Sequence, residues 1–226
     1  MVTGFSLGKK PLIGIAAAGA IIAAVLVFSQ SGSSFTTSAD SNPVVAEVDG
    51  QEILLDEVND AVRIASTQGA KLDNSTALDQ IITKTLLLEE AQRRNIVVTM
   101  DDAAKELENT YTKNGLTKQQ FEDRLAQLGT TYEQTLDLFR QQMIINKVLS
   151  SEITNADIQV SDREAMAFFN DNLDQIKSQV GNNTVFDDVS SQIKDSILLQ
   201  KQRQMVTDLV SKLKDQATIL TFKDRM

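Results

Sequence analysis

The stretch PVVAEVDGQEILL, residues 43–55, predicts a β-hairpin near the start of the folded part of the chain. In its first half, Val44, Ala46 and Val48 alternate with Val45 and Glu47. Asp49-Gly50 then stands before a second β-prone run, and an Asp-Gly pair in this setting is a strong signal for a tight turn. We therefore expect two short antiparallel strands joined at this pair.

Helical periodicity dominates the chain after the hairpin. Asp56 is expected to cap a first helix, with Glu57 in its first turn. Ser161 and Glu164 have the spacing of a capping box and open another helix, and QVGNNT at residues 179–184 is a clear break. Apolar side chains at helical spacing predict helices at residues 56–68, 77–94, 99–113, 117–128, 132–152 and 186–216.

The segment ATILTF, residues 217–222, is β-prone again. A lone two-stranded hairpin is only marginally stable, so we expect this segment to pair with the hairpin. Residues 43–226 are thus predicted to form one mostly α domain with a small sheet that contains the hairpin and a C-terminal strand.

The N-terminal segment PLIGIAAAGAIIAAVLVF, residues 11–28, is uncharged and as a helix would span roughly 27 Å, close to the thickness of a bilayer core. Lys9 and Lys10 precede it, and no Lys or Arg follows before Arg63. This bias predicts a single-pass signal anchor in the cell membrane, with residues 1–10 in the cytoplasm and the remainder outside. A cleaved signal peptide and a buried soluble helix are the alternatives.

The polar, Ser-rich residues 29–42 are expected to form a flexible tether.

Composition argues against several classes of function. The formal net charge of −9 disfavours nucleic acid as a partner. Cys and His are both absent, which excludes disulfides, thiol chemistry and the commonest general base and zinc ligand. Carboxylate pairs such as Asp101-Asp102 are interpreted as first-turn or solvated charges, and the sequence has no calcium-loop or phosphate-loop motif. We therefore expect no enzymatic activity, no cofactor and no metal.

Six segments, taken in order, carry a family resemblance. None is specific alone, because each is an amphipathic helix with a cap, but their succession resembles the SurA/PrsA-like extracytoplasmic foldases and their SurA N-terminal-like chaperone domain. The segments are VAEVDGQEILLDEVNDAV (45–62), LLLEEAQRRNI (86–96), VVTMDDAAKELENTY (97–111), residues 115–149, IQVSDREAMAFFNDNLDQI (158–176) and residues 184–219.

The chain departs from that family at one place. Residues 178–185 stand where the resemblance implies a parvulin-type prolyl isomerase domain, and eight residues are far too few for a domain. The polar cluster typical of parvulin sites also cannot be assembled without His or Cys. The resemblance therefore implies a chaperone core that lacks isomerase activity.

We expect an ATP-independent, membrane-anchored extracytoplasmic chaperone that holds unfolded or newly exported polypeptides. An extracellular adaptor that binds one folded partner is the alternative, and either protein has surfaces suited to a homodimer. Asn74 and Asn182 lie in glycosylation sequons in predicted turns. The candidate peptide-binding residues, which are alternatively plain core residues, are the large apolar side chains Tyr132, Phe139, Met143, Met166 and Phe169.

Overall fold

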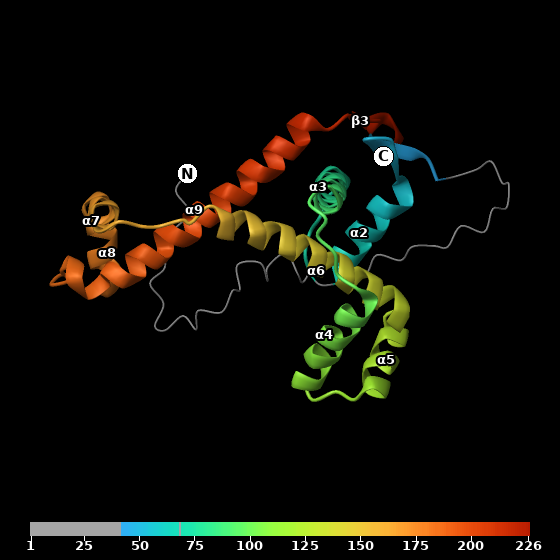
Figure 1. Ribbon diagram of the computed structural model, residues 1–226, viewed down its shortest axis with the longest axis horizontal. Coiled ribbons are helices and arrows are strands. Elements are labelled where there is room, and N and C mark those ends of the chain that lie inside the picture. Colours follow the sequence, from blue (N-terminus) through green and yellow to red (C-terminus); the bar gives the residue numbers. More distant parts are fainter. Residues whose placement is uncertain (1–41, 68) are drawn as a thin grey trace. The chain divides into compact units, whose positions relative to one another are not determined.

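The computed structural model describes residues 42–67 and 69–226 and shows a mostly helical fold with a small sheet (Figure 1). This confirms the predicted helical class. The strands are β1 (Val44–Val48), β2 (Gln51–Leu54) and β3 (Ile219–Thr221). The helices are α2 (Leu55–Thr67), α3 (Asn74–Arg93), α4 (Met100–Lys113), α5 (Lys118–Gln127), α6 (Tyr132–Asn155), α7 (Asp162–Asp171), α8 (Leu173–Val180), α9 (Phe186–Gln216) and the 3-10 helix η1 (Lys223–Arg225).

The structure corrects the prediction of a membrane-spanning fold and of a single-pass location in the cell membrane. Within residues 42–67 and 69–226, no helix combines the length and the apolar character needed to cross a bilayer. Even the longest, α9, carries Asp, Lys or Arg in every part of its length. The predicted span at residues 11–28 and its flanking segments, 1–10 and 29–41, lie outside the described residues.

The sheet has the strand order β2-β1-β3, and both pairs are antiparallel. Asp49 and Gly50 form the turn between β1 and β2 with φ angles of +47° and +89°. Positive φ at both central residues matches the twist of a two-residue hairpin, which explains why Asp-Gly is used here. Strand β3 pairs with β1 through Ala46–Thr221 and Val48–Ile219, so the predicted pairing of the C-terminal segment with the hairpin is confirmed.

Helix starts follow the predicted capping chemistry with two corrections. Thr99 and Thr117 cap α4 and α5 at the predicted helix starts, and each hydroxyl accepts a backbone N–H three residues later. Asp56 does not cap α2, because the helix already begins at Leu55 and the Glu57 carboxylate accepts the N–H of Leu54 instead.

The predicted capping box at the start of α7 is only half formed. The Ser161 hydroxyl accepts the N–H of Glu164 at 3.2 Å. The Glu164 carboxylate does not reach back to Ser161, because it pairs with Lys201 on α9 at 2.9 Å. A tertiary ion pair has therefore taken the place of the second capping interaction.

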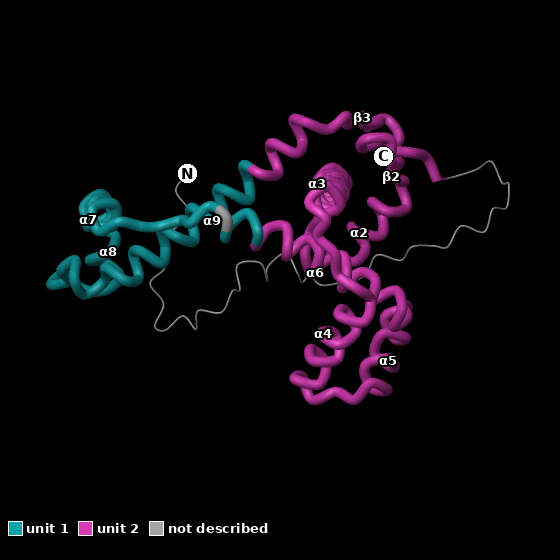
Figure 2. The backbone as a smooth tube through the Cα atoms, in the orientation of Figure 1, with its two compact units in different colours: residues 1–17, 151–208 teal, residues 18–150, 209–226 magenta. Residues whose placement is uncertain are grey.

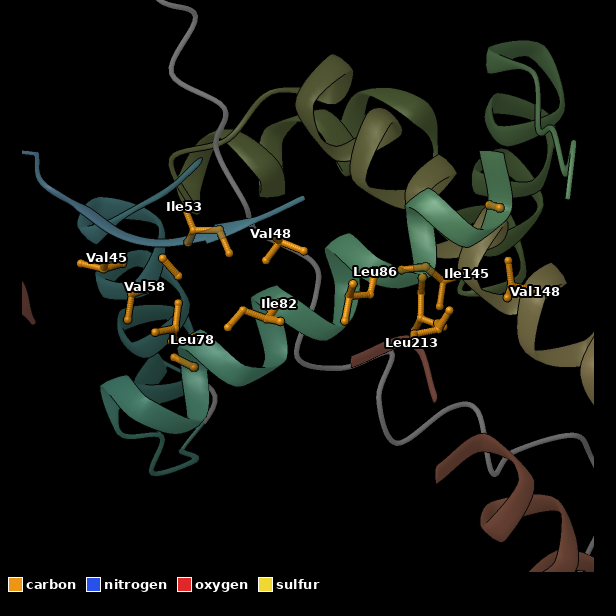
Figure 3. Close-up of a cluster of buried hydrophobic side chains, with 14 of the residues drawn as sticks. Val45, Val48, Ile53, Val58, Leu78, Ile82, Leu86, Ile145, Val148 and Leu213 are labelled. Carbon is orange, nitrogen blue, oxygen red and sulfur yellow. The ribbon is translucent and has the colours of Figure 1, made fainter. Parts of the chain in front are cut away.

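The described residues group into two compact units, one made of residues 151–208 and the other of residues 42–150 with 209–226 (Figure 2). The larger unit buries β1, β2 and α2 against α3, α6 and the end of α9. Figure 3 shows its core, which includes Val45, Ile53, Leu86, Val148 and Leu213. The smaller unit has its own core, formed by α7, α8 and the first half of α9.

Candidate functional site

Three of the predicted peptide-binding residues, Tyr132, Phe139 and Met143, lie on α6 in the larger unit. All three are half-buried. They pack against a cluster from α4, the segment just before it and the start of α6. Its buried members are Val98, Ala103, Leu107, Tyr111 and Leu136. Each side chain therefore has one part in the core and one part in solvent, which leaves limited apolar area for a ligand.

An aromatic row fixes the position of Tyr132. The rings of Tyr111 and Phe121 stack at 4.9 Å between centroids, and Phe121 meets Tyr132 edge-on at 6.5 Å. The Lys118 ammonium lies 4.8 Å from the centroid of the Tyr132 ring, within the range of a cation–π contact. These contacts hold the Tyr132 ring against α5.

The other two predicted residues lie on α7 in the smaller unit, and their environments differ. Phe169 is 7% exposed and meets Phe186 edge-on at 5.8 Å in the core. Met166 is 41% exposed and lies on the surface. Sequence spacing alone did not separate the two. The structure thus places three of the five residues in the larger unit and two in the smaller unit, and their role in binding stays a prediction.

A cleft of about 420 Å³ between α7 and α9, within the smaller unit, was not predicted from the sequence. It is lined by residues of α7 and α9 alone: Glu164, Ala167, Phe168, Asp171, Ile197, Gln200, Lys201 and Gln204. The α9 residues recur at three- and four-residue spacing, so they share one face of the helix. The residue spacing could therefore have predicted this face of α9. It could not have predicted that α7 packs beside it, because that contact depends on tertiary structure.

Charges at this cleft are arranged asymmetrically. The Lys201 ammonium binds the Glu164 carboxylate at 2.9 Å and the carbonyl of Gln159 at 3.0 Å. The Asp171 carboxylate is exposed and pairs with no cation of the described residues. Lys201, the one cationic residue among those lining the cleft, is thus already paired with a carboxylate, and the net charge of the lining residues is negative.

The larger unit contains a partly buried charge cluster that the sequence did not reveal. Burial lowers the pKa of the Lys84 ammonium, and the carboxylates of Glu57 and Asp137 act in the opposite direction. Burial also raises the pKa of Glu57, opposed by the N–H of Leu54 and by Lys84. The three groups come from α3, α2 and α6, and the attraction of Lys84 for the two carboxylates favours the packing of these helices.

The described residues include carboxylate groups and both predicted glycosylation sequons. In the portion of the chain that the structure describes, no group of three or more Asp or Glu side chains is placed to hold a metal ion. Asn74 is the first residue of α3 and is half-buried, whereas Asn182 is exposed in the turn after α8. Use of either sequon stays a prediction.

Comparison with known proteins gives consistent matches. Residues 1–149 match the family model described as the SurA-like N-terminal domain. A Haemophilus influenzae protein named as a SurA peptidyl-prolyl cis-trans isomerase is 33% identical over 150 residues, which is 64% of this chain and 44% of that protein. The chaperone SurA of Pseudomonas syringae is 29% identical over 146 residues, covering 61% of this chain and 33% of the relative. The foldase protein PrsA of Clostridium botulinum is 22% identical over 160 residues, covering 61% and 47%.

A solved structure shares the fold. It comes from work describing the virulence factor PEB4 and a periplasmic protein as two structurally related SurA-like chaperones of Campylobacter jejuni. The TM-score is 0.61 at 15% identity, with 80% of this chain and all of the other covered. The chain spans less than half the length of the three named relatives. Since the family model matches well over half of its residues, the chain belongs to the SurA-like N-terminal domain family.

Proposed function

We propose that this chain is an ATP-independent chaperone that holds unfolded polypeptides by apolar contacts and has no prolyl isomerase activity. The observation that carries the proposal is the open α7–α9 cleft, whose floor includes Phe168 and Ile197, in a member of the SurA-like family. Unfolded chains expose apolar side chains, and such a surface binds them without requiring one sequence.

The predicted peptide-binding residues fit this proposal unequally. Met166 offers an exposed and adaptable side chain on α7, on a face of the helix that does not line the cleft. Tyr132, Phe139 and Met143 offer the half-exposed surface of α6 as a second contact area. Phe169 is assigned a supporting role, since it is buried in the core that positions α7.

The absence of isomerase activity rests on the connection between α8 and α9. Residues 181–185 alone join these helices, so no domain is inserted at this point. The 226 residues also include neither His nor Cys. The relative from Haemophilus influenzae bears an isomerase name but is matched over less than half its length, which agrees with a shared chaperone part.

The test is suppression of aggregation of a chemically unfolded protein on dilution, monitored by light scattering, without nucleotide. A several-fold molar excess of the chain is expected to reduce scattering strongly, and the same excess of an inert acidic protein is the control. No reduction with any of several unrelated clients would remove the proposal. A parallel assay of prolyl isomerisation in a short peptide is expected to show the uncatalysed rate, and measurable catalysis would overturn that part.

A pull-down separates this function from that of an adaptor. The chaperone is expected to bind several unfolded clients weakly and to release them when they fold. One stoichiometric folded partner that displaces all unfolded clients would favour the adaptor instead.

A further inference from the structure

We propose that the α7–α9 cleft selects short peptide segments in which a large apolar side chain lies beside a lysine or arginine. This inference deepens the proposed function and rests on it, because it names the kind of segment that the chaperone engages first. It follows from three properties of the cleft, namely its size, its floor and its charge.

The size and floor suit one or two apolar side chains. A volume of about 420 Å³ lies within the roughly 300–1,000 Å³ of typical ligand pockets. Ile197 is buried and Phe168 half-buried, and Ala167 is a small exposed residue that leaves the space open. Gln200 supplies an amide on the α9 wall, which is able to donate to and accept from a peptide backbone.

The charge at the rim decides which residues lie next to the apolar one. Lys201 is held by Glu164, so its charge is already matched inside the protein. On the same unit, Lys194 is held by Asp162 at 2.6 Å. Asp171 remains as an exposed carboxylate on the rim without a cationic partner among the described residues. A lysine or arginine of a bound segment would form an ion pair with the Asp171 carboxylate.

The wider charge of the smaller unit points the same way. Residues 151–208 contain ten Asp and Glu against five Lys and Arg, a formal charge of −5. An acidic segment approaching the cleft would therefore be repelled, while a basic one would be attracted over about a Debye length. Charge complementarity thus favours an apolar-basic segment over an apolar-acidic one.

The test compares two labelled peptides of the same length and apolar residues, one with lysines and one with glutamates at the flanking positions. Binding to the full chain is measured by fluorescence anisotropy. The lysine peptide is expected to bind at least fivefold more tightly, and its advantage is expected to shrink as salt is raised. Equal affinities at low salt would overturn the inference.

Asp171→Asn is the variant that locates the effect. It removes one charge with little change in shape and is expected to weaken the lysine peptide about twofold to fivefold while leaving the glutamate peptide unchanged or slightly tighter. Asp195→Asn is the matched control, because Asp195 is exposed on α9 but lies roughly 200° around the helix from the cleft residue Ile197. Equal weakening by both variants would show a general charge effect and remove the assignment to the cleft.

Ala167→Trp tests the cavity independently of charge. The indole is expected to fill the cleft and weaken the lysine peptide more than tenfold, whereas Ala126→Trp at an exposed position of α5 is the control. Circular dichroism melts confirm that both variants fold.

If aggregation is suppressed while Ala167→Trp leaves peptide affinity unchanged, the proposed function stands and this inference fails. If the peptide binds in the cleft but aggregation is not suppressed, the inference stands and the holding function fails.

Discussion

Asp49 and Thr218 exchange two hydrogen bonds although 169 residues separate them. The N–H of Asp49 donates to the carbonyl of Thr218 at 3.0 Å, and the Asp49 carboxylate accepts the N–H of Thr218 at 2.7 Å. Asp49 also holds the first position of the hairpin turn. One residue therefore shapes the β1–β2 hairpin and attaches the segment that leads into β3.

Replacing Asp49 tests this double role. Asp49→Ala removes the acceptor for the Thr218 N–H and places a Cβ-bearing residue without a local hydrogen bond at φ +47°. We expect a loss of about 1–3 kcal/mol in the free energy of unfolding, measured by urea denaturation. Asp49→Asn keeps an acceptor oxygen and tolerates positive φ, so it is expected to lose less than about 0.5 kcal/mol. Equal losses in the two variants would assign the effect to charge instead.

Leu213 and Leu220 offer a test of the larger core. Leu213 at the end of α9 is 2% exposed and belongs to the core shown in Figure 3, whereas Leu220 in β3 is 48% exposed. Leu213→Ala is expected to cost about 2–5 kcal/mol, because it removes buried methyl groups and leaves a cavity. Leu220→Ala, the matched control, is expected to cost less than about 1 kcal/mol. The shift of the urea unfolding midpoint, at an unchanged dependence of the free energy on urea concentration, measures both costs. Similar midpoint shifts in the two variants would contradict the assignment of Leu213 to the core.

The cap of α3 makes stability depend on acid pH. The Thr76 N–H and hydroxyl both donate to the Asp73 carboxylate and lower its pKa below 3.8. A lowered pKa in the folded state means that the contribution is present above the ordinary Asp pKa of 3.8 and is lost as the pH falls below 3.8 through the lowered pKa of the folded state.

The measurement is the melting temperature of the wild type and of Asp73→Asn between pH 5 and pH 3. Asn caps helices well but does not titrate in this range, so the variant is expected to lose less stability on acidification. Parallel curves for the two proteins would show that this cap does not titrate as described.

Replacing Met166 and Phe169 in turn distinguishes the effect of a surface residue from that of a core residue. Met166→Ala is expected to reduce aggregation suppression with little change in melting temperature, because the residue is 41% exposed and lies outside the core. Phe169→Ala is expected to destabilise the smaller unit by about 3–5 kcal/mol. Met100→Ala, at an equally exposed methionine of α4, is the control for loss of a surface thioether. Identical activity in the Met166 and Met100 variants would remove Met166 from the binding surface.

The features that were predictable from sequence are those that neighbouring residues determine. Asp49-Gly50 specifies its turn through backbone conformation, and Thr99 and Thr117 specify helix starts through hydrogen bonds three residues away. The pairing of β3 with the hairpin was also predictable, because a two-stranded hairpin alone is only marginally stable.

The features that were missed depend on contacts between distant segments. The helix expected from residue 161 is divided into α7 and α8 at Asn172, whose side-chain amide donates to the carbonyl of Phe168 at 2.8 Å and competes with the helical ladder. The α7–α9 cleft and the Lys84 cluster unite residues from separate helices. Of the five predicted binding residues, periodicity identified apolar positions but carried no information on whether Met166 or Phe169 faces solvent.

The central position of β1 has a consequence for how the protein is made. Its neighbour β2 follows after two residues, but Thr218, which leads into β3, emerges from the ribosome 169 residues after Asp49. At cellular translation speeds this delay is roughly 10 to 30 seconds. During that time β1 has an open hydrogen-bonding edge of the kind that promotes aggregation. The sheet of this protein is therefore incomplete until the ribosome has synthesised α9 and the β3 segment that follows it.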